Sequence, residues 1–514
     1  MRLFDSGKFP VYHYSVVTGI LVLKKFVKEK DLAARTAGFR KAMGFIEFFI
    51  NILSTPAVLV GLFAMIGLIL QAKPVEEIIK GTFKTIVGFL VLSAGAGYLT
   101  GGNGPLTNFG VLFNATFSVT GSTPNNEAVV AIALGKVAST TAYIMIVGMI
   151  ANIVLARLSR MKYIFLTGHH TLYMGCLLAV VLNVAGLSQW QTVVAGGLVL
   201  GLVMVLAPAL AAPTMKKITG GEEVVLGHFG TFGYWISAQV GKLFKGKGDK
   251  PKSTEEINFP QRLAFLRDTT VAIAITMVFF FLVISIVGAV KGVFSEGGEL
   301  YGILAGEGGL RASWIVWAIV QGLAFAAGVF VILAGIRLII GEIVPAFRGI
   351  GEKLVPQAKP ALDCPITFPY APNAVLIGFL SSFVGGIVGL GLIFAINGGI
   401  GGAALAIILP GVIPHFFCGA TAGVFGNATG GTKGCVFGAF IQGIVITFLP
   451  AFLYLVLGQI VGQGTTFGDA DFAIVGLVLG GISLKVKTWG LFVICIVLYL
   501  LPIVLAPLAK SKKA

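Results

Sequence analysis

The chain has 514 residues, of which 56% are hydrophobic and only 11% are charged, and its mean hydropathy is +0.95. A soluble globular protein carries roughly 25% charged residues because its surface faces water, so this composition excludes a water-exposed globule. The formal net charge is +16, but the basic residues gather in short segments between apolar ones. The positive-inside rule and anionic lipid headgroups explain this distribution better than nucleic-acid binding does. We therefore expect a polytopic protein of the cell membrane, with the lipid bilayer and no nucleic acid as a partner.

Ten apolar stretches approach or exceed the roughly 20 residues that cross the hydrocarbon core as a helix. Two weaker stretches, 108–134 and 403–425, are apolar but rich in Gly, Asn and Pro. They predict re-entrant hairpins or broken helices, which are tolerated at membrane depth only where they are buried in protein or line a cavity. The pattern predicts an all-α polytopic membrane protein with about 10–11 transmembrane helices plus re-entrant hairpins, an organisation typical of a transporter. The ten strong stretches are 45–71, 85–99, 140–156, 164–187, 192–212, 271–290, 315–340, 374–396, 437–461 and 489–508.

A polar, basic segment at residues 242–268 separates two halves of similar size. Its Lys and Arg residues predict that it lies in the cytoplasm, and the basic tail predicts the same for the C-terminus. A short echo between residues 77–84 and 342–348 favours an internal repeat. The predicted parts are a basic N-terminal extension (1–42), a first transmembrane repeat (43–241), a cytoplasmic linker (242–268), a second transmembrane repeat (269–462), and a C-terminal helix with a basic tail (463–514).

The N-terminal extension, residues 1–42, has two open interpretations. It contains one apolar run that basic residues follow, not a small-residue cleavage site, so we expect no cleavable signal peptide. Either it is a cytoplasmic arm that lies on anionic lipid, or it precedes a native start at Met43.

The clearest candidate for a functional side chain is Asp363, because charged groups inside apolar regions are costly and usually functional. Neighbouring prolines, among them Pro360 and Pro365, break any helix there and free backbone groups to face a ligand. Asp363, with Asn373 nearby, is suited to accept hydrogen bonds from substrate hydroxyls. The alternative is an acid in a cytoplasmic loop.

Two glycine–histidine motifs are further candidates, at Gly168–His169 and Gly227–His228. A neutral imidazole both donates and accepts hydrogen bonds, which suits a polyol or a sugar acid. The alternative is an interfacial histidine bonded to its own backbone, and for the adjacent His170 the two interpretations are evenly balanced.

Other residues lie where a ligand can approach. Gly95 permits close approach of a backbone to a ligand or to another helix. Asn126 belongs to a polar cluster, 123–127, within the first weak stretch, which predicts that it lines the same cavity. The five cysteines form no CxxC or CxxH pair, which argues against a zinc site and a disulfide framework. The sequence contains no Walker loop, HExxH, GxSxG or nucleotide fingerprint, so we expect no metal, no cofactor and no energy-coupling chemistry within this chain.

These motifs together resemble the membrane permease component, enzyme IIC, of the ascorbate-type (ascorbate/galactitol superfamily) phosphotransferase system. The similarity includes both glycine–histidine motifs, residues 362–364 with 370–374, and residues 413–425. Residues 78–89 are similar to that family's second helix. The resemblance extends from about Met43 to the C-terminus.

The resemblance implies a homodimer with two inverted repeats in each protomer, which has a rigid dimerisation part and a mobile, elevator-type core. It implies that the substrate cavity is lined by Gly95, His169, His228 and Asp363. It further implies that separate IIB and IIA proteins are partners and that a phosphorylated cysteine of IIB supplies the phosphoryl group. No catalytic residue is then expected in this chain, unless Asp363 orients the accepting hydroxyl or takes its proton.

Three positions depart from the family's pattern and bear on the substrate. Phe229 and Tyr173 stand where the family tends to have glutamine, and Asn126 stands where it has tyrosine. The default substrate is therefore L-ascorbate, with a related sugar acid or polyol as the alternative. A proton- or sodium-coupled secondary transporter of a sugar or organic anion is the rival function, in which the same acid and histidines form a proton relay.

Overall fold

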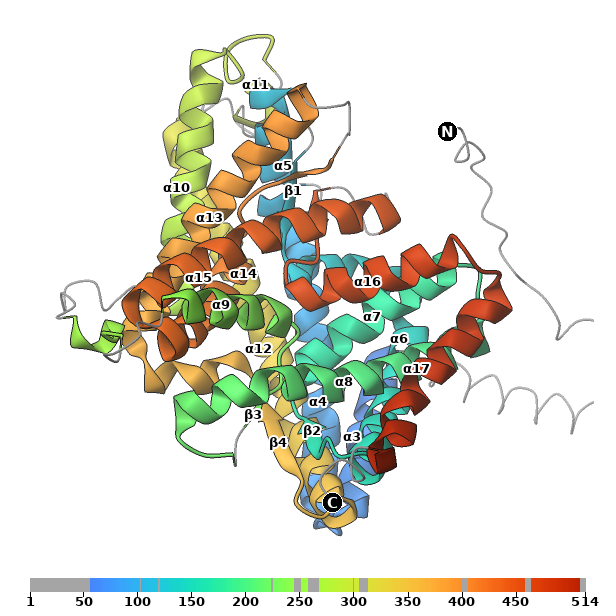
Figure 1. The fold of residues 1–514 in the computed structure, drawn as a ribbon. Helices are drawn as coiled ribbons and strands as arrows, with labels where there is room; N and C mark the ends of the chain where they lie inside the picture. The colour runs from blue at the N-terminus through green and yellow to red at the C-terminus, as the bar shows by residue number, and fades with distance from the viewer. Residues whose placement is uncertain are drawn as a thin grey trace, which may run out of the picture. The chain divides into compact units, whose positions relative to one another are not determined.

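The long apolar runs fold as α-helices in the computed structural model (Figure 1), because a helix satisfies its backbone hydrogen bonds internally where no water is present. The structure describes residues 56–101, 103–118, 121–222, 225–244, 251–257, 268–298, 300–304, 313–399, 405–457 and 464–508. The predicted extension at 1–42 lies outside these residues, and so do parts of the linker and the basic tail.

Short extended segments separate some of the helices that precede the linker. They are α3 (Pro56–Leu70), α4 (Val75–Thr100), α5 (Pro105–Phe117), α6 (Asn126–Leu158), α7 (Gly168–Val184), α8 (Gln189–Thr219) and α9 (Thr231–Leu243).

Short extended segments also separate some of the helices that follow the linker. They are α10 (Thr269–Val290), α11 (Tyr301–Leu304), α12 (Trp314–Leu354), α13 (Pro372–Gly399), α14 (Val412–Pro414), α15 (Ala420–Leu457), α16 (Ala470–Ser483) and α17 (Thr488–Leu508). Three short turns complete the order: the 3-10 turns η1 (Thr254–Glu256) and η3 (Cys364–Tyr370), and the π-helical turn η4 (His415–Gly419).

The described helices confirm an all-α polytopic membrane protein. Among the described residues, eight helices are long and apolar enough to cross a membrane. The lengths of the apolar stretches alone predict about ten to eleven such helices. Two predicted stretches account for the difference: the first, 45–71, lies partly outside the described residues, and 164–187 contains α7, a shorter apolar helix. Within the stretch predicted at 164–187, the first residues belong to a strand rather than to a helix.

Both weak stretches are broken helices, as predicted. In the first, α5 ends at Phe117, and the strand β1 (Gly121–Pro124) separates it from α6. In the second, the strand β5 (Ile407–Ile408) leads through α14 and η4 into α15. Polar and small residues free the backbone here, and strand pairing satisfies the freed groups.

Six short strands form two three-stranded parallel sheets, which sequence analysis does not predict. The first has the order β5-β1-β6, with β6 at Thr465–Thr466. The second has the order β2-β4-β3, with β2 at Tyr163–Phe165, β4 at Lys359–Leu362 and β3 at Val225–Leu226. In each sheet the middle strand comes from one half of the chain and both outer strands come from the other half. The two halves are therefore joined by exchanged strands.

Glycines allow the helices around the sheets to approach closely. A Cβ atom at Gly378 in α13 would lie 2.7 Å from Cα of Gly423 in α15, so these helices touch backbone to backbone. Such contacts between small residues are a common means of packing membrane helices.

Candidate functional site

Three candidate segments meet because they follow three strands of one parallel sheet. His169 and His170 open α7 after β2, Asp363 directly follows β4, and His228 lies two residues after β3. The carboxyl ends of parallel strands meet at one edge of a sheet, which is where open α/β sheets also bind ligands. Residues separated by almost two hundred positions thus come together at one place.

The second sheet faces the same space with its own carboxyl ends. Asn126 follows β1, Pro414 follows β5, and Asp469 follows β6. The two sheets enclose a cavity of about 530 Å³, a size typical of small-molecule sites. Its lining residues are Asn126, Glu127, His169, His170, Tyr173, His228, Arg337, Asp363, Cys364, Pro365, Phe368, Pro372, Val375, Ile413, Pro414, Phe416, Phe417 and Asp469.

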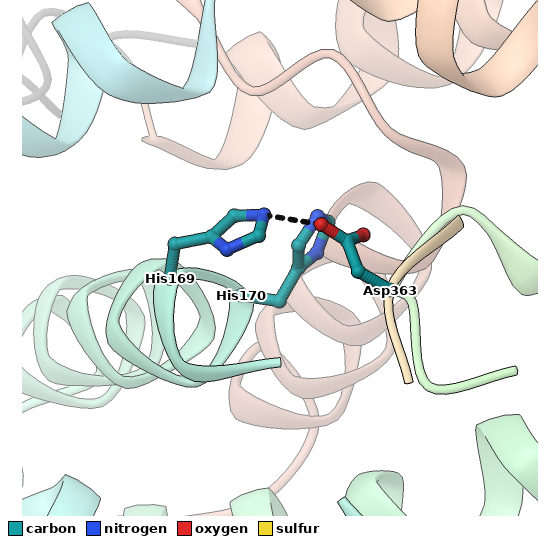
Figure 2. A group of neighbouring side chains, drawn as sticks. All are labelled: His169, His170 and Asp363. Carbon is teal, nitrogen blue, oxygen red and sulfur yellow. Dashed lines mark ion pairs between the residues drawn. The ribbon is translucent and has the colours of Figure 1, made fainter. Parts of the chain in front are cut away.

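Asp363 lies between two imidazoles at the rim of this cavity. One carboxylate oxygen is 3.5 Å from Nε2 of His169 (Figure 2). The other is 3.8 Å from Nε2 of His228. The backbone N–H of Cys364 donates to the same carboxylate at 2.7 Å, which fixes its orientation at the start of η3. The side chain remains 37% exposed, so it is accessible to a ligand.

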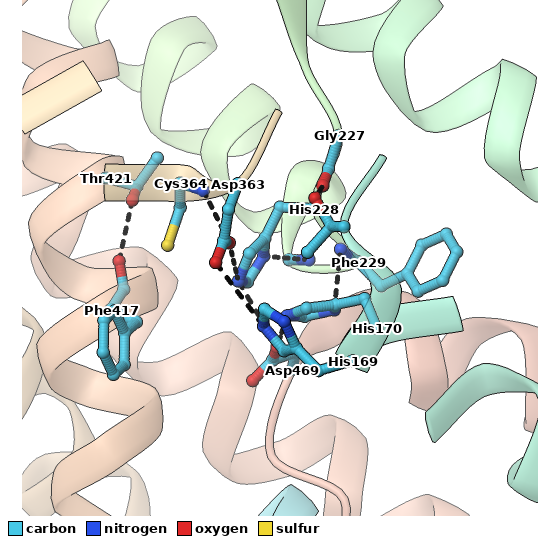
Figure 3. Close-up of polar contacts among 12 residues, drawn as sticks. His169, His170, Gly227, His228, Phe229, Asp363, Cys364, Phe417, Thr421 and Asp469 are labelled. Atoms are coloured by element: carbon cyan, nitrogen blue, oxygen red, sulfur yellow. Dashed lines mark hydrogen bonds and ion pairs between the residues drawn. The ribbon is translucent and has the colours of Figure 1, made fainter. Parts of the chain in front are cut away.

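Backbone groups determine which nitrogen of two imidazoles faces the cavity. The N–H of Phe229 donates to Nδ1 of His170 at 3.3 Å, and the N–H of Gly230 donates to Nδ1 of His228 at 3.0 Å. The hydroxyl of Tyr234 lies 2.8 Å from the same Nδ1 of His228. A nitrogen that accepts a backbone N–H carries no proton, so each ring is neutral and carries its proton on Nε2. Both Nε2–H groups point towards acids of the cavity (Figure 3).

Asp469 lines the cavity, although sequence analysis does not predict it. Its Oδ2 lies 3.8 Å from Nε2 of His170 and 3.9 Å from Nε2 of His228, and its Oδ1 accepts a 3.0 Å hydrogen bond from the side chain of Asn126. Figure 3 shows Asp469 beside the adjacent rings of the two histidines. The sequence does contain a signal: Asp469 follows Gly468 and directly precedes the apolar helix α16. A glycine likewise directly precedes the polar residue at Gly227–His228.

A neighbouring acid, Asp471, supports this arrangement from outside the cavity. Its carboxylate accepts hydrogen bonds from the N–H groups of Thr231 and Phe232 at 3.0 and 2.9 Å, which caps the N-terminus of α9. The N–H of Asp471 donates to the carbonyl of Phe229 at 2.9 Å. The loop that carries His228 is thereby tied to the start of α16.

Five residues predicted for the site line the cavity together: Asn126, His169, Tyr173, His228 and Asp363. His170, for which two interpretations were open, lines it as well. The other three predicted residues, Gly95, Phe229 and Asn373, lie elsewhere.

Gly95 and Phe229 have packing environments. A Cβ at Gly95 would lie 2.8 Å from the backbone N of Ile332, so this glycine permits contact between α4 and α12. The ring of Phe229 is fully buried and stacks on Phe165 at a centroid distance of 4.7 Å. The contribution of Phe229 to the site is its backbone N–H, which orients His170.

Asn373 connects the linker to α13. Its side chain donates to the carbonyls of Thr254 and Ile257 at 3.1 and 2.9 Å. The carboxylate of Glu255 accepts from the backbone N–H groups of Asn373 and Ala374, which caps the helix as an acid at an N-terminus does. Asn373 thus anchors the linker.

The same cluster has the residue types of a metal site, but its tautomers fit hydrogen bonding better. Three groups have ligand atoms within 4.8 Å of one another: His169–His170–Asp363, His170–His228–Asp469 and His228–Asp363–Cys364. Each includes His170 or His228, whose Nε2 carries the proton and therefore offers no lone pair to a cation. The arrangement presents donors and acceptors, which is what a hydroxylated ligand requires.

Comparison with known proteins identifies the family. Residues 51–471 match the model of the PTS system sugar-specific permease component, EIIC-GAT. The chain belongs to this family. The ascorbate-specific PTS system EIIC component of Mycoplasma pneumoniae (strain ATCC 29342 / M129 / Subtype 1) is 28% identical over 442 residues, which cover 77% of this chain and 65% of that relative. The chain thus spans a little less than two thirds of that relative's length.

Family membership agrees with the architecture and with the sequence motifs. The matched region includes both sheets and every residue that lines the cavity. The resemblance seen in the sequence is therefore confirmed, and the multi-pass membrane character agrees with the eight apolar helices among the described residues.

Proposed function

We propose that this EIIC-GAT family member is the membrane permease of a phosphoenolpyruvate-dependent phosphotransferase system. It binds L-ascorbate, or a related sugar acid or polyol, and presents it for phosphorylation by a separate IIB protein. The observation that carries this proposal is Asp363, flanked by His169 and His228 in a cavity of about 530 Å³. A carboxylate with imidazole donors matches vicinal hydroxyl groups, which both donate and accept.

The residues of this chain bind and orient the substrate rather than supply the phosphoryl group. Asp363 accepts a hydrogen bond from the hydroxyl that is to be phosphorylated and assists in removing its proton. His228, with its Nε2–H directed into the cavity, donates to a neighbouring oxygen. The phosphorylated cysteine of IIB supplies the phosphoryl group, and the charged product has little tendency to return.

The transport cycle that we propose is an elevator motion of a core within a homodimer. The exchange of strands between the two halves supports inverted repeats at 43–241 and 269–462. We count β6, at Thr465–Thr466, with the second repeat because it pairs with β1 as β3 pairs with β4. The cavity between the two sheets would move with the core as one unit.

We propose that the cytoplasmic face includes the linker, the C-terminus and the surface that IIB contacts, with IIA as a further soluble partner. The described part of the linker is fixed to the core: the side chain of Asn427 contacts Ser253 and the N–H of Thr254. The N–H of Thr432 donates to the carbonyl of Lys252 at 2.8 Å. The linker sequence as a whole, 242–268, has more basic than acidic residues, which suits an acidic partner surface.

Uptake into vesicles tests the proposed function. Radiolabelled ascorbate and polyols are supplied with and without phosphoenolpyruvate and the soluble phosphotransferase proteins. Accumulation of a phosphorylated product only with the donor is the expected result. Uptake of unmodified substrate driven by a proton or sodium gradient would indicate the rival, a secondary transporter.

Replacement of Asp363 by Asn tests the central residue. We expect Asp363→Asn to abolish uptake while the protein remains in the membrane, because an amide is a weaker acceptor and does not take the proton. The matched control is Glu222→Gln, which changes an exposed carboxylate outside the cavity. Unchanged uptake by Asp363→Asn would remove this residue from the site.

A further inference from the structure

We propose that Asp469 is a second substrate-binding carboxylate, which together with Asp363 makes the cavity select uncharged polyhydroxy compounds over sugar-acid anions. This inference rests on the proposed function, since it assigns the substrate class of the same site.

Asp469 is placed to contact a ligand from the wall opposite Asp363. It follows β6 of one sheet, whereas Asp363 follows β4 of the other, and both line the cavity. The side chain of Asp469 is 4% exposed, and the Asn126 amide holds one of its oxygens. Its other oxygen faces His170 and His228 at 3.8 and 3.9 Å. These separations exceed a direct hydrogen bond, so the Asp469 oxygen and the two Nε2–H groups remain free to bond a ligand hydroxyl that approaches from the cavity.

Neither histidine beside Asp469 is available as a positive charge. An imidazolium carries protons on both nitrogens, whereas Nδ1 of His170 and of His228 accepts a backbone N–H. These rings therefore remain neutral donors through Nε2. They satisfy ligand oxygens but do not balance the charge of an acid.

The charge of the cavity consequently opposes an anion. Asp363 and Asp469 supply two carboxylates, and Arg337, on an exposed position of α12, is the cation among the described lining residues. Like charges in a partly desolvated cavity repel strongly. Hydroxyl groups, in contrast, donate to each carboxylate and accept from each imidazole without adding charge.

A buried polar atom in the cavity wall indicates a ligand that forms hydrogen bonds there. Nδ1 of His169 is buried and lacks a hydrogen-bond partner among the described residues. Buried polar atoms normally have partners. His169 lines the cavity, so a polyol that spans from Asp363 to Asp469 is suited to supply this bond.

Equilibrium binding to the full-length chain in proteoliposomes tests this selectivity without phosphotransferase partners. The probes are galactitol and a matched pair of similar size, L-gulono-1,4-lactone, which is uncharged, and L-ascorbate, which is an anion at neutral pH. We expect the wild type to bind galactitol or the lactone more tightly than ascorbate. Asp469→Asn keeps the shape and an oxygen for Asn126, but loses the charge.

In Asp469→Asn we expect affinity for the uncharged probes to fall about 10- to 100-fold, the usual effect of losing a charged hydrogen-bond partner. Affinity for ascorbate should be unchanged or higher. Glu222→Gln is the control for removal of a carboxylate outside the cavity, and the thermal unfolding midpoint of each variant confirms folding. The conservative Asp469→Glu should retain the preference for uncharged probes.

Three results would overturn the inference: tighter binding of ascorbate than of both uncharged probes, an equal loss for all probes in Asp469→Asn, or no binding of the uncharged probes. The proposed function is judged separately, by phosphoenolpyruvate-dependent phosphorylation of whichever probe binds. An Asp469-dependent preference without phosphorylation would sustain the selectivity and reject the phosphotransferase role.

Discussion

The ring of Phe229 stacks on the ring of Phe165, 4.7 Å away, at an interplanar angle of 16°. This contact directs the side chain that follows His228 into the protein core. Restoring the glutamine that the ascorbate-type family tends to have here should therefore not restore a ligand contact. We expect Phe229→Gln to lower the free energy of unfolding by about 2–5 kcal/mol, through lost packing and a buried amide.

Thermal unfolding in detergent, combined with the substrate concentration for half-maximal uptake, distinguishes the two roles of Phe229. Phe229→Leu keeps an apolar side chain and the backbone N–H to His170, so it should lose less stability. An increase in substrate affinity in Phe229→Gln at an unchanged unfolding midpoint would contradict the packing role.

Gly95 offers a test of helix contact against ligand contact. Its missing Cβ would lie 2.8 Å from the backbone of Ile332, so Gly95→Ala should destabilise the protein by about 1–3 kcal/mol, as overpacking does. Gly97, two residues later in α4, has no atom within 4 Å of the same position. Gly97→Ala should therefore be neutral or stabilising by up to about 1 kcal/mol. Unfolding midpoints of the two variants measure the difference, and equal midpoints would argue against the contact.

Asn373→Ala should release the linker and leave the cavity intact. The variant loses the side-chain hydrogen bonds to Thr254 and Ile257, at a cost of about 1–3 kcal/mol for the exposed carbonyls and the lost contacts. Faster limited trypsin cleavage within residues 242–268 is the expected readout. Asn427→Ala, which loses the contacts to Ser253 and Thr254, should behave similarly. A loss of substrate affinity without faster cleavage would place Asn373 in the site.

Glu222 gives a pH-dependent prediction outside the membrane-spanning helices. Hydrogen bonds from Lys216 and Lys359, at 2.6 and 3.0 Å, lower the pKa of Glu222 from 4.5 to about 2. Because the folded-state pKa is depressed, the stabilisation is complete above pH 4.5 and is lost as the pH falls towards 2. The unfolding midpoints of wild type and Glu222→Gln should thus differ at pH 7 and converge on acidification. A constant difference would contradict the ion pairs.

The membrane helices were predictable because span length and apolar character are local properties of a sequence. The two sheets were not, since strands such as β3 have only two residues and pair with partners in the other half. Their cue, Gly- and Pro-rich interruptions, predicted broken helices but not which segments would pair.

The site was predictable where one residue carried an unusual signal by itself. Asp363 and His228 stand out as polar groups beside breaks in apolar regions, and the structure brings them within 3.8 Å. Asp469 looked like an ordinary acid before a helix, and only the pairing of β6 with β1 places it in the cavity. The backbone N–H that orients His170 comes from Phe229, 59 residues later, a relationship that no local pattern reveals.

The exchange of strands also affects how the protein is made. β1 is synthesised early, but its pairing partner at Ile407 follows Gly121 by 286 residues. Every helix between β1 and β5 must enter the bilayer before these two strands can pair. The backbone groups of β1 that pair with β5 therefore lack this partner until β5 has been synthesised. Contacts so distant along the chain are slow to close. A membrane-inserted fragment that stops before β5 should therefore need insertion factors to persist, or else be degraded by proteases. The two halves expressed as separate chains should become stable only when they are present together.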